Sequence, residues 1–201
     1  MGIRGLKLGY WGSINKMAIA DYIFKVLIIG DASGSKHSFV RRYSSGLFNP
    51  DRKLSIGVEY YLKTAFFKNK EIKLQIWELG IDLKLPSLFS QYCKDANGAF
   101  FIYDITNIES LENLVDWIQM IRENAGDIPI ILIGSKSDLY DLREVSYLEG
   151  IRTATKYNLA AFLEVSAKSG ENVIKAFEIM IKLLINFPSQ NTIEILNNWK
   201  I

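Results

Sequence analysis

The chain has 201 residues, 49% hydrophobic and 23% charged, which is the composition of one soluble globular domain with a sizeable core. The formal net charge of +2 excludes a strong electrostatic attraction to nucleic acid or to an acidic membrane, so no nucleic-acid partner is expected. The single cysteine, Cys93, excludes an internal disulfide and fits a reducing, cytoplasmic location, and the single histidine, His37, excludes sites that need two histidines.

Both ends of the chain are predicted to lie outside the folded domain. Residues 1–20 are interpreted as a mobile N-terminal extension, residues 21–187 as the domain and residues 188–201 as a short C-terminal tail. The N-terminal stretch holds no apolar run long enough for a signal peptide. The chain ends in Asn-Trp-Lys-Ile without a cysteine, so we expect no lipid anchor there.

Short apolar runs alternate with helical patterns along the chain, which predicts a parallel sheet with crossover helices. The first strand is predicted over residues 23–29, and a Gly/Ser-rich turn then leads into a helix through residues 39–43. The runs 58–67 and 71–77 are predicted to form a hairpin, joined by a tight turn at residues 68–70. This hairpin supplies the one antiparallel strand of the sheet.

Three further strands are predicted at nearly continuous apolar runs, over residues 98–103, 130–133 and 161–165. Such runs are typical of strands that are covered on both faces. The elements together predict an α/β fold with a six-stranded, mostly parallel sheet, one antiparallel strand, and helices on both faces.

Two helices are indicated by apolar residues at helical spacing, and we expect these residues to be buried in the core. They are Leu111, Leu114, Val115, Ile118 and Ile121 on the first helix and Val173, Ile174, Phe177, Met180, Ile181 and Leu184 on the second. Thr106 and Glu109 are spaced to form a capping box at the start of the first helix.

The residues that follow the first predicted strand are the first candidate site, because ligands of open parallel sheets bind at the carboxyl ends of strands. Residues 30–37 read Gly-Asp-Ala-Ser-Gly-Ser-Lys-His, whereas a phosphate-binding loop reads G-x-x-x-x-G-K-[ST]. Gly30 and Lys36 have the correct separation, but Ser35 replaces the second glycine and His37 the Mg²⁺-binding hydroxyl residue. Taken alone, this segment fits an ordinary strand-to-helix turn with an exposed lysine equally well.

Taken in order, the segments near the strand ends resemble those of the small GTPases, and of the Rab branch in particular. The resemblance rests on residues 21–30, Ser-Ile-Gly-Val-Glu at 55–59, Lys-Leu-Gln-Ile-Trp at 73–77, Tyr-Asp-Ile-Thr at 103–106, Gly-Ser-Lys-Ser-Asp at 134–138 and Ser-Ala-Lys at 166–168. These segments keep the family's order and spacing across about residues 20–187. The resemblance implies a P-loop NTPase fold of the small-GTPase type, with GTP or GDP as the ligand.

The resemblance also implies a guanine-reading group. Asp138 matches the aspartate whose carboxylate accepts the N1 and N2 hydrogens of guanine, a pattern that adenine does not offer. Ser135 replaces the asparagine that supports the base-binding loops, so only part of that contact is expected. Lys136 matches the lysine that covers the base, Ala167 the residue whose backbone N–H meets the guanine oxygen, and Phe48 the aromatic residue that stacks on the base. The full predicted nucleotide-binding set is Gly30, Ser33, Gly34, Ser35, Lys36, His37, Ser38, Phe48, Ser135, Lys136, Asp138, Ser166, Ala167 and Lys168.

The metal position of the family is altered in this chain. His37 replaces a serine or threonine whose hydroxyl binds Mg²⁺, a hard ion that prefers oxygen ligands. Imidazole suits softer metals, but a lone histidine makes no metal site, so we expect His37 to cap or pack on the first helix. Ser55 and Glu78 remain as weak candidate Mg²⁺ ligands. Ser35 would cost about 1–2 kcal/mol relative to glycine if its φ angle were positive.

The second switch segment departs further from the family. The family reads Trp-Asp-Thr-Ala-Gly-Gln where residues 77–82 read Trp-Glu-Leu-Gly-Ile-Asp. Ile81 replaces the glycine that lets the switch swing onto the γ-phosphate, and Asp82 replaces the glutamine that orients the attacking water. A carboxylate cannot donate a hydrogen bond to that water, and its charge lies near an anionic phosphate. We therefore expect no intact catalytic residue and poor intrinsic hydrolysis.

Three functions remain open on this basis. A GTP-binding module with impaired or absent hydrolysis, which acts by docking partner proteins, is favoured because most base-reading residues are kept while the metal, switch and water-orienting positions change together. A slow but functional GTPase switch in trafficking or signalling is the second, and a scaffold that binds no nucleotide is the third. Protein effectors are expected at the switch-like surface of residues 54–85, to which Tyr60, Tyr61 and Trp77 give an aromatic character.

Overall fold

The computed structural model describes residues 20–31, 33–48, 57–80 and 86–186. Over these residues, six strands form one sheet in the order β2-β3-β1-β4-β5-β6. The strands are β1 (Tyr22–Ile29), β2 (Val58–Phe67), β3 (Lys70–Leu79), β4 (Gly98–Asp104), β5 (Ile130–Ser135) and β6 (Ala161–Val165). Strand β2 runs antiparallel to β3, and the other neighbouring pairs of this sheet are parallel, as the alternating pattern predicted.

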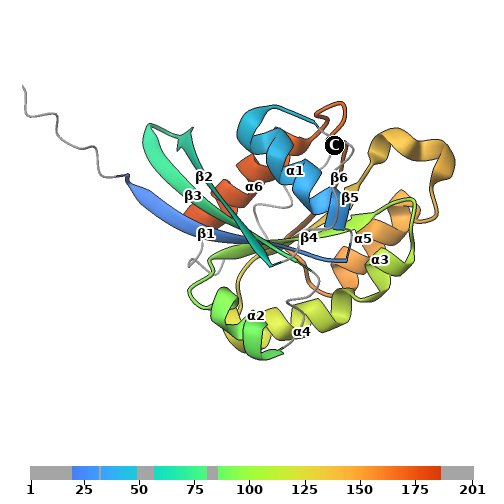
Figure 1. Ribbon diagram of the computed structural model, residues 1–201, viewed down its shortest axis with the longest axis horizontal. Helices are drawn as coiled ribbons and strands as arrows, with labels where there is room; N and C mark the ends of the chain where they lie inside the picture. The colour runs from blue at the N-terminus through green and yellow to red at the C-terminus, as the bar shows by residue number, and fades with distance from the viewer. Residues whose placement is uncertain (1–19, 32, 49–56, 81–85, 187–201) are drawn as a thin grey trace, which may run out of the picture.

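Helices cover both faces of the sheet, which confirms the predicted α/β fold class (Figure 1). They are α1 (Ser33–Ser45), α2 (Pro86–Cys93), α3 (Glu109–Glu112), α4 (Leu114–Ala125), α5 (Tyr147–Lys156), α6 (Val173–Asn186) and a short 3₁₀ helix, η2 (Ser137–Leu142). Helices α1 and α6 lie on one face, and α2 and α4 lie on the opposite face. No helix of the described ranges is both long and apolar enough to cross a bilayer.

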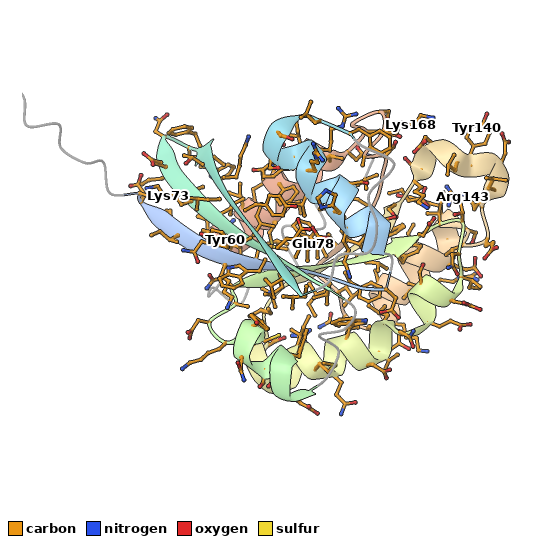
Figure 2. The ribbon with its side chains drawn as sticks, viewed as in Figure 1. Tyr60, Lys73, Glu78, Tyr140, Arg143 and Lys168 are labelled. Atoms are coloured by element: carbon orange, nitrogen blue, oxygen red, sulfur yellow. The ribbon has the colours of Figure 1, made fainter. Side chains whose placement is uncertain are left out.

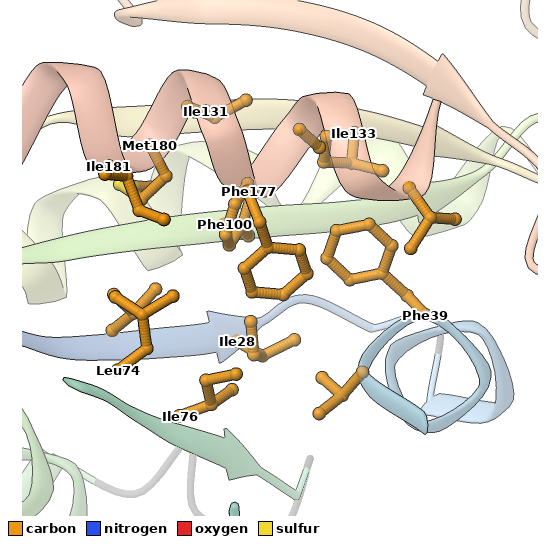
Figure 3. Close-up of a cluster of buried hydrophobic side chains, with 14 of the residues drawn as sticks. Ile28, Phe39, Leu74, Ile76, Phe100, Ile131, Ile133, Phe177, Met180 and Ile181 are labelled. Carbon is orange, nitrogen blue, oxygen red and sulfur yellow. The ribbon is translucent and has the colours of Figure 1, made fainter. Parts of the chain in front are cut away.

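Two hydrophobic clusters form the core, one on each face of the sheet, because successive side chains of a strand point to opposite faces. Val26 and Ile28 of β1 belong to the cluster under α1 and α6, whereas Leu27 and Ile29 belong to the cluster under α2 and α4. Figure 3 shows the first cluster, where the rings of Phe39 and Phe177 stack with their centroids 5.0 Å apart. This burial on both faces explains the continuous apolar runs of the central strands.

The β2–β3 hairpin closes through a two-residue turn in which Lys68 and Asn69 have φ angles of 48° and 62°. Positive φ at both positions is the type I′ geometry that matches the twist of a hairpin. The resulting register places Glu59 directly opposite Glu78 across the ladder. Figure 2 shows Glu78 on the side of the hairpin that faces α1.

The predicted capping box at Thr106 and Glu109 is wrong. Thr106 instead donates both its backbone N–H and its hydroxyl to Oδ1 of Asp104, at 2.9 and 2.7 Å. Helix α3 begins without a side-chain cap. A capping box is present on α5, where the hydroxyl of Ser146 and the carboxylate of Glu149 satisfy each other's backbone N–H groups.

The two predicted apolar stripes are buried only in part. Val115 and Ile174 are 44% and 64% exposed, although their spacing had placed them in the core. Trp117, which the predicted stripe did not include, is fully buried together with Leu114 and Ile121, and this helical spacing leaves Val115 to one side of the buried face. The predicted extension and tail lie outside the described residues, apart from Ala20, and the domain limits at 21 and 187 stay predictions.

Candidate functional site

A cavity of about 450 Å³ lies where the carboxyl ends of the parallel strands meet the start of α1. This volume is in the range of small-molecule sites. Many of the residues predicted to bind nucleotide line the cavity, namely Gly34, Ser35, Ser38, Phe48, Ser135, Lys136, Asp138, Ala167 and Lys168. The tertiary structure therefore brings together residues from the first half of α1, from the end of β5 and the start of η2, and from the loop after β6, which are far apart in the chain.

The carboxylate of Asp138 is held in place at the start of η2. The hydroxyl of Ser166, which is fully buried, donates to Oδ1 of Asp138 at 2.6 Å. The far end of η2 is anchored by Arg143, whose guanidinium donates to both carboxylate oxygens of Glu164 on β6, at 2.5 and 2.8 Å. A bidentate pair of this kind fixes geometry as well as charge, so the Asp138 carboxylate is preorganised at the cavity.

The residues next to Asp138 make different contacts from those that the resemblance implies. Ser135 is buried, and its hydroxyl donates to the carbonyl oxygen of Tyr103 at 2.6 Å, so it ties β5 to the neighbouring strand β4. Lys136 has a φ angle of 65° and pairs with Oδ2 of Asp104 at 2.5 Å. Both side chains still line the cavity.

Arg42 of α1 supports the loop after β6 at Ala167 and Lys168, a role that sequence reasoning missed. Its guanidinium donates to the carbonyl oxygens of Ala167, at 2.5 Å, and of Lys168. A third N–H donates at 2.7 Å to the carbonyl of Gly46, just past the end of α1. One arginine inside a helix carries no sequence signal for this role, because its acceptors lie about 125 residues further along the chain.

The turn after β1 requires glycine at position 30. Gly30 is buried with a φ angle of 116°, and a Cβ atom there would lie 2.3 Å from the carbonyl oxygen of Ile102. The ammonium of Lys36 donates to the carbonyl of Gly30 at 2.5 Å, and the lysine is fully buried. The interpretation as an ordinary turn with an exposed lysine is therefore wrong.

Asp31 ties the same turn to α4, a second contact that sequence reasoning missed. Its Oδ1 accepts from the indole Nε1 of Trp117 at 2.8 Å, and its Oδ2 accepts from Nδ2 of Asn113 at 2.5 Å. Both carboxylate oxygens are thus occupied by donors from the start of α4. This leaves Asp31 as a structural anchor of the turn.

Ser35 lies inside α1, which begins at Ser33, and its φ angle is not among the positive ones of the described residues. The strain that a positive φ would have imposed on Ser35 is therefore absent. Its side chain is 6% exposed. Gly34, one residue earlier, has open space where a Cβ would lie.

His37 is not a lone histidine, and the expectation that it only caps or packs on the first helix is wrong. Its ring is 3% exposed, and Nδ1 lies 3.4 Å from Oε2 of Glu59 and 3.5 Å from Oε2 of Glu78. Glu78 is fully buried. The hydroxyl of Tyr61 lies 3.2 Å from the same Nδ1 and donates to Oε2 of Glu59 at 2.6 Å.

Glu59 joins this cluster although sequence reasoning did not single it out. The available signal was the hairpin register, since a turn at residues 68–69 places Glu59 directly opposite Glu78. Of the other predicted switch residues, Ser55, Ile81 and Asp82 lie outside the described part of the chain, as does the side chain of Ser33.

The described part of the switch-like surface is apolar on the outer side of β2. Tyr60, Leu62 and Phe66 are 49%, 57% and 75% exposed. Trp77 is half-buried and contacts the ring of Tyr60 edge-on, with the centroids 5.3 Å apart. Tyr61, which was expected on this surface, instead points to His37.

Comparison with known proteins finds one matching family model and relatives that are all named as Ras-related or GTP-binding proteins. The model of the Ras family matches residues 25–186. The chain is 38% identical to the Ras-related protein Rab-11B of Dictyostelium discoideum, over 89% of this chain and 82% of the relative. It is 36% identical to the GTP-binding protein ypt3 of Schizosaccharomyces pombe, over 87% and 81%, and 38% identical to the human Ras-related protein Rab-8B, over 81% of each.

Proposed function

The chain belongs to the Ras family, and we propose that it is a Rab-like protein that binds guanine nucleotide, turns it over slowly or not at all, and acts by docking partner proteins. The observation that carries the proposal is the contrast between two parts of one site. Asp138 is held at the cavity by Ser166, whereas a buried imidazole, His37, stands at the metal position of the phosphate loop.

Guanine selection follows from the chemistry of Asp138. Guanine presents two adjacent donors, N1–H and the C2 amino group, and one carboxylate accepts from both. Adenine presents an acceptor at N1 and no amino group at C2, so it would leave the carboxylate unpaired. The hydrogen bond from Ser166 uses one lone pair of Oδ1 and leaves the other acceptor positions of the carboxylate for the base.

Phosphate binding is supported by Lys36 and by the turn that precedes it. Gly30 allows the backbone to turn sharply after β1, and Lys36 lies over this turn with its ammonium on the Gly30 carbonyl. The first turn of α1 also presents backbone N–H groups to this end of the cavity, which favours an anionic ligand.

The side chains near His37 do not fit the magnesium ion that the family implies. Mg²⁺ requires a nearly octahedral set of oxygen ligands and usually keeps several waters. At this position an imidazole nitrogen lies within 3.5 Å of both carboxylates, and the hydroxyl of Tyr61 donates a hydrogen bond to Glu59 at 2.6 Å. Together with the replacements at Ile81 and Asp82, this supports weak or absent hydrolysis.

A slow GTPase switch is the second candidate, and the carboxylate of Glu78 favours it. Glu78 is the second-last residue of β3, at the position where the family has an aspartate near the metal. The extra methylene of glutamate shifts that carboxylate but keeps its charge. Turnover by such a site would be slow rather than absent.

Nucleotide competition tests the base assignment. The purified full chain, stripped of nucleotide, is titrated with a fluorescent GDP that GTP, GDP or ATP then displaces. We expect displacement by GTP and GDP and little by ATP, and equal competition by ATP would refute guanine selection. Asp138→Asn should weaken GDP binding and improve binding of the xanthine nucleotide, whose C2 carbonyl accepts from the new amide. Asp141→Asn, an exposed change on the same 3₁₀ helix, is the matched control.

Single-turnover measurement tests the loss of hydrolysis. The chain is loaded with GTP, and the GTP and GDP contents are followed by chromatography, with and without a magnesium chelator. We expect slow or undetectable conversion and a weak effect of the chelator on nucleotide affinity. Conversion and a chelator response at the level of an ordinary Rab protein would contradict the proposal. Failure to bind any guanine nucleotide would favour the scaffold function instead.

A further inference from the structure

We propose that His37, Glu59 and Glu78 form a binding site for a first-row transition-metal dication, of which Zn²⁺ is the probe. Among the described residues, these three side chains are the group whose imidazole and carboxylate donor atoms all lie within 4.8 Å of one another. The proposal rests on this geometry and not on nucleotide binding.

The spacing of the donor atoms fits a small ion. Zn²⁺ binds histidine nitrogen and carboxylate oxygen at about 2.0–2.2 Å, so neighbouring ligands of a tetrahedron lie about 3.3–3.6 Å apart. The two separations from Nδ1 of His37, 3.4 Å to Glu59 and 3.5 Å to Glu78, fall in this range. The third separation joins the carboxylate oxygens of Glu59 and Glu78. A rotation of the Glu59 side chain, which is 30% exposed, would bring it into the same range.

Charge and burial also favour a cation at this point. Glu59 and Glu78 are directly opposite each other in an antiparallel ladder, where like charges repel. Glu78 has no exposed surface, and burying a carboxylate costs solvation free energy that a nearby cation offsets. A dication neutralises the two carboxylates together, and a neutral imidazole completes the ligand set without adding charge.

The donor types select the class of metal. One imidazole nitrogen and two carboxylate oxygens suit Zn²⁺ and its first-row neighbours, whereas Mg²⁺ and Ca²⁺ favour oxygen alone. The hydroxyl of Tyr61 donates a hydrogen bond to Glu59 at 2.6 Å. Tyr61 would therefore orient the carboxylate of Glu59 without binding the metal itself. The exposed side of Glu59 leaves an entry path and a fourth position for water.

A bound ion would join three elements, because His37 is on α1, Glu59 on β2 and Glu78 on β3. The hairpin would then be fastened to α1 by the protein's own side chains. The ion should therefore raise the thermal stability of the chain both with and without nucleotide.

The test uses the full chain without an affinity tag, stripped of metal with a chelator that is then removed. Zn²⁺ is titrated against a chromophoric chelator, with and without excess Mg²⁺ and with and without GDP. We expect one equivalent of Zn²⁺ to bind and to raise the Tm, with no displacement by Mg²⁺. Absence of stoichiometric binding, or displacement by Mg²⁺, would overturn the proposal.

Three variants assign the site. His37→Asn keeps a hydrogen-bonding group but loses the imidazole, and it should weaken Zn²⁺ affinity at least about 100-fold; Glu59→Gln should weaken it at least about 10-fold. Glu71→Gln, at the other end of the same hairpin, is the matched control and should bind as the wild type does. Affinity that is unchanged in His37→Asn and Glu59→Gln places the metal elsewhere and refutes this site.

A spectroscopic readout on the unaltered chain guards against variants that fail to fold. Co²⁺ in a tetrahedral site has intense visible absorption bands, whereas octahedral Co²⁺ has weak ones. We expect the intense bands to appear at one equivalent of Co²⁺ and to disappear when Zn²⁺ is added. A spectrum of the weak octahedral type throughout would overturn the proposal.

Discussion

The indole Nε1 of Trp117 donates a hydrogen bond to Oδ1 of Asp31 at 2.8 Å, which joins helix α4 to the turn after strand β1. The indole is fully buried, and Asn113 occupies the second carboxylate oxygen of Asp31. The turn that leads to Lys36 is therefore held by a helix from the opposite face of the sheet.

Replacing this indole tests the contact. Trp117→Phe removes the donor but keeps an aromatic ring, and it should lower the free energy of unfolding by about 2–4 kcal/mol, from the lost hydrogen bond to a charged acceptor and the lost volume. Trp77→Phe is the control, since the indole N–H of Trp77 has no hydrogen-bond partner within the described ranges. Urea denaturation measures both, and equal losses would show that the bond to Asp31 contributes nothing.

Gly30 and Gly34, which both follow strand β1, make a matched pair for substitution. Gly30→Ala should destabilise the fold by at least about 2 kcal/mol, because its φ angle is 116° and the new Cβ would meet the Ile102 carbonyl. Gly34→Ala should be neutral or stabilising by up to about 1 kcal/mol, since it adds a helix-favouring residue in open space. Thermal or urea unfolding distinguishes the two, and similar effects would contradict the description of the turn.

Arg42→Lys should loosen the loop after β6, at Ala167 and Lys168, although the charge is kept. A lysine cannot reproduce the three hydrogen bonds of the guanidinium to the carbonyls of Ala167, Lys168 and Gly46. Loss of about 1–2 kcal/mol would lower GDP affinity about 5- to 30-fold and reduce the Tm as well. Arg41→Lys on the same helix is the control. A fall in Tm without any change in GDP affinity would separate this support role from the proposed nucleotide site.

Burial raises the pKa of Cys93 to about 12, from 9.0, and that of Tyr43 to about 12, from 10.0. Both groups stay protonated in the folded chain at a pH where the unfolded chain has released those protons. Their contribution to stability is therefore complete below about pH 9 and is lost as the pH rises above it. We expect the free energy of unfolding to fall above about pH 9, with a smaller slope in Cys93→Ala. The native thiol should also resist thiol reagents until the chain unfolds, and a prompt reaction at neutral pH would contradict its burial.

Most of the sheet could be predicted from periodicity. Two strands, β2 and β6, have the predicted limits, and the hairpin predicted at residues 58–77 supplies the antiparallel pair of the described sheet. The helices were less predictable, because the buried face of α4 runs through Leu114, Trp117 and Ile121, and the predicted stripe had left Trp117 out. A stripe counted without Trp117 assigned Val115 to the core, although Val115 is 44% exposed.

The candidate site, too, could be predicted from the sequence only in part. The resemblance indicated Asp138, Lys36 and the residues around them as candidates, because these positions form contiguous motifs. It did not locate Arg42, Asp31 or Glu59, whose partners come from elements remote in the chain. No local pattern marks such residues, since their chemistry depends on a neighbour that only the fold supplies.

The amino-acid sequence by itself determined the fold class and the family, because hydrophobic periodicity and ordered motifs are local properties of the chain. The tertiary structure alone decided the environment of His37. The residue is one imidazole in a helix until the hairpin register brings Glu59 and Glu78 beside it. Electrostatic interactions depend on distances through space and not on separation along the chain. Glu59 and Glu78 are 22 and 41 positions from His37 in the chain, and the fold brings both carboxylates within 3.5 Å of the imidazole nitrogen.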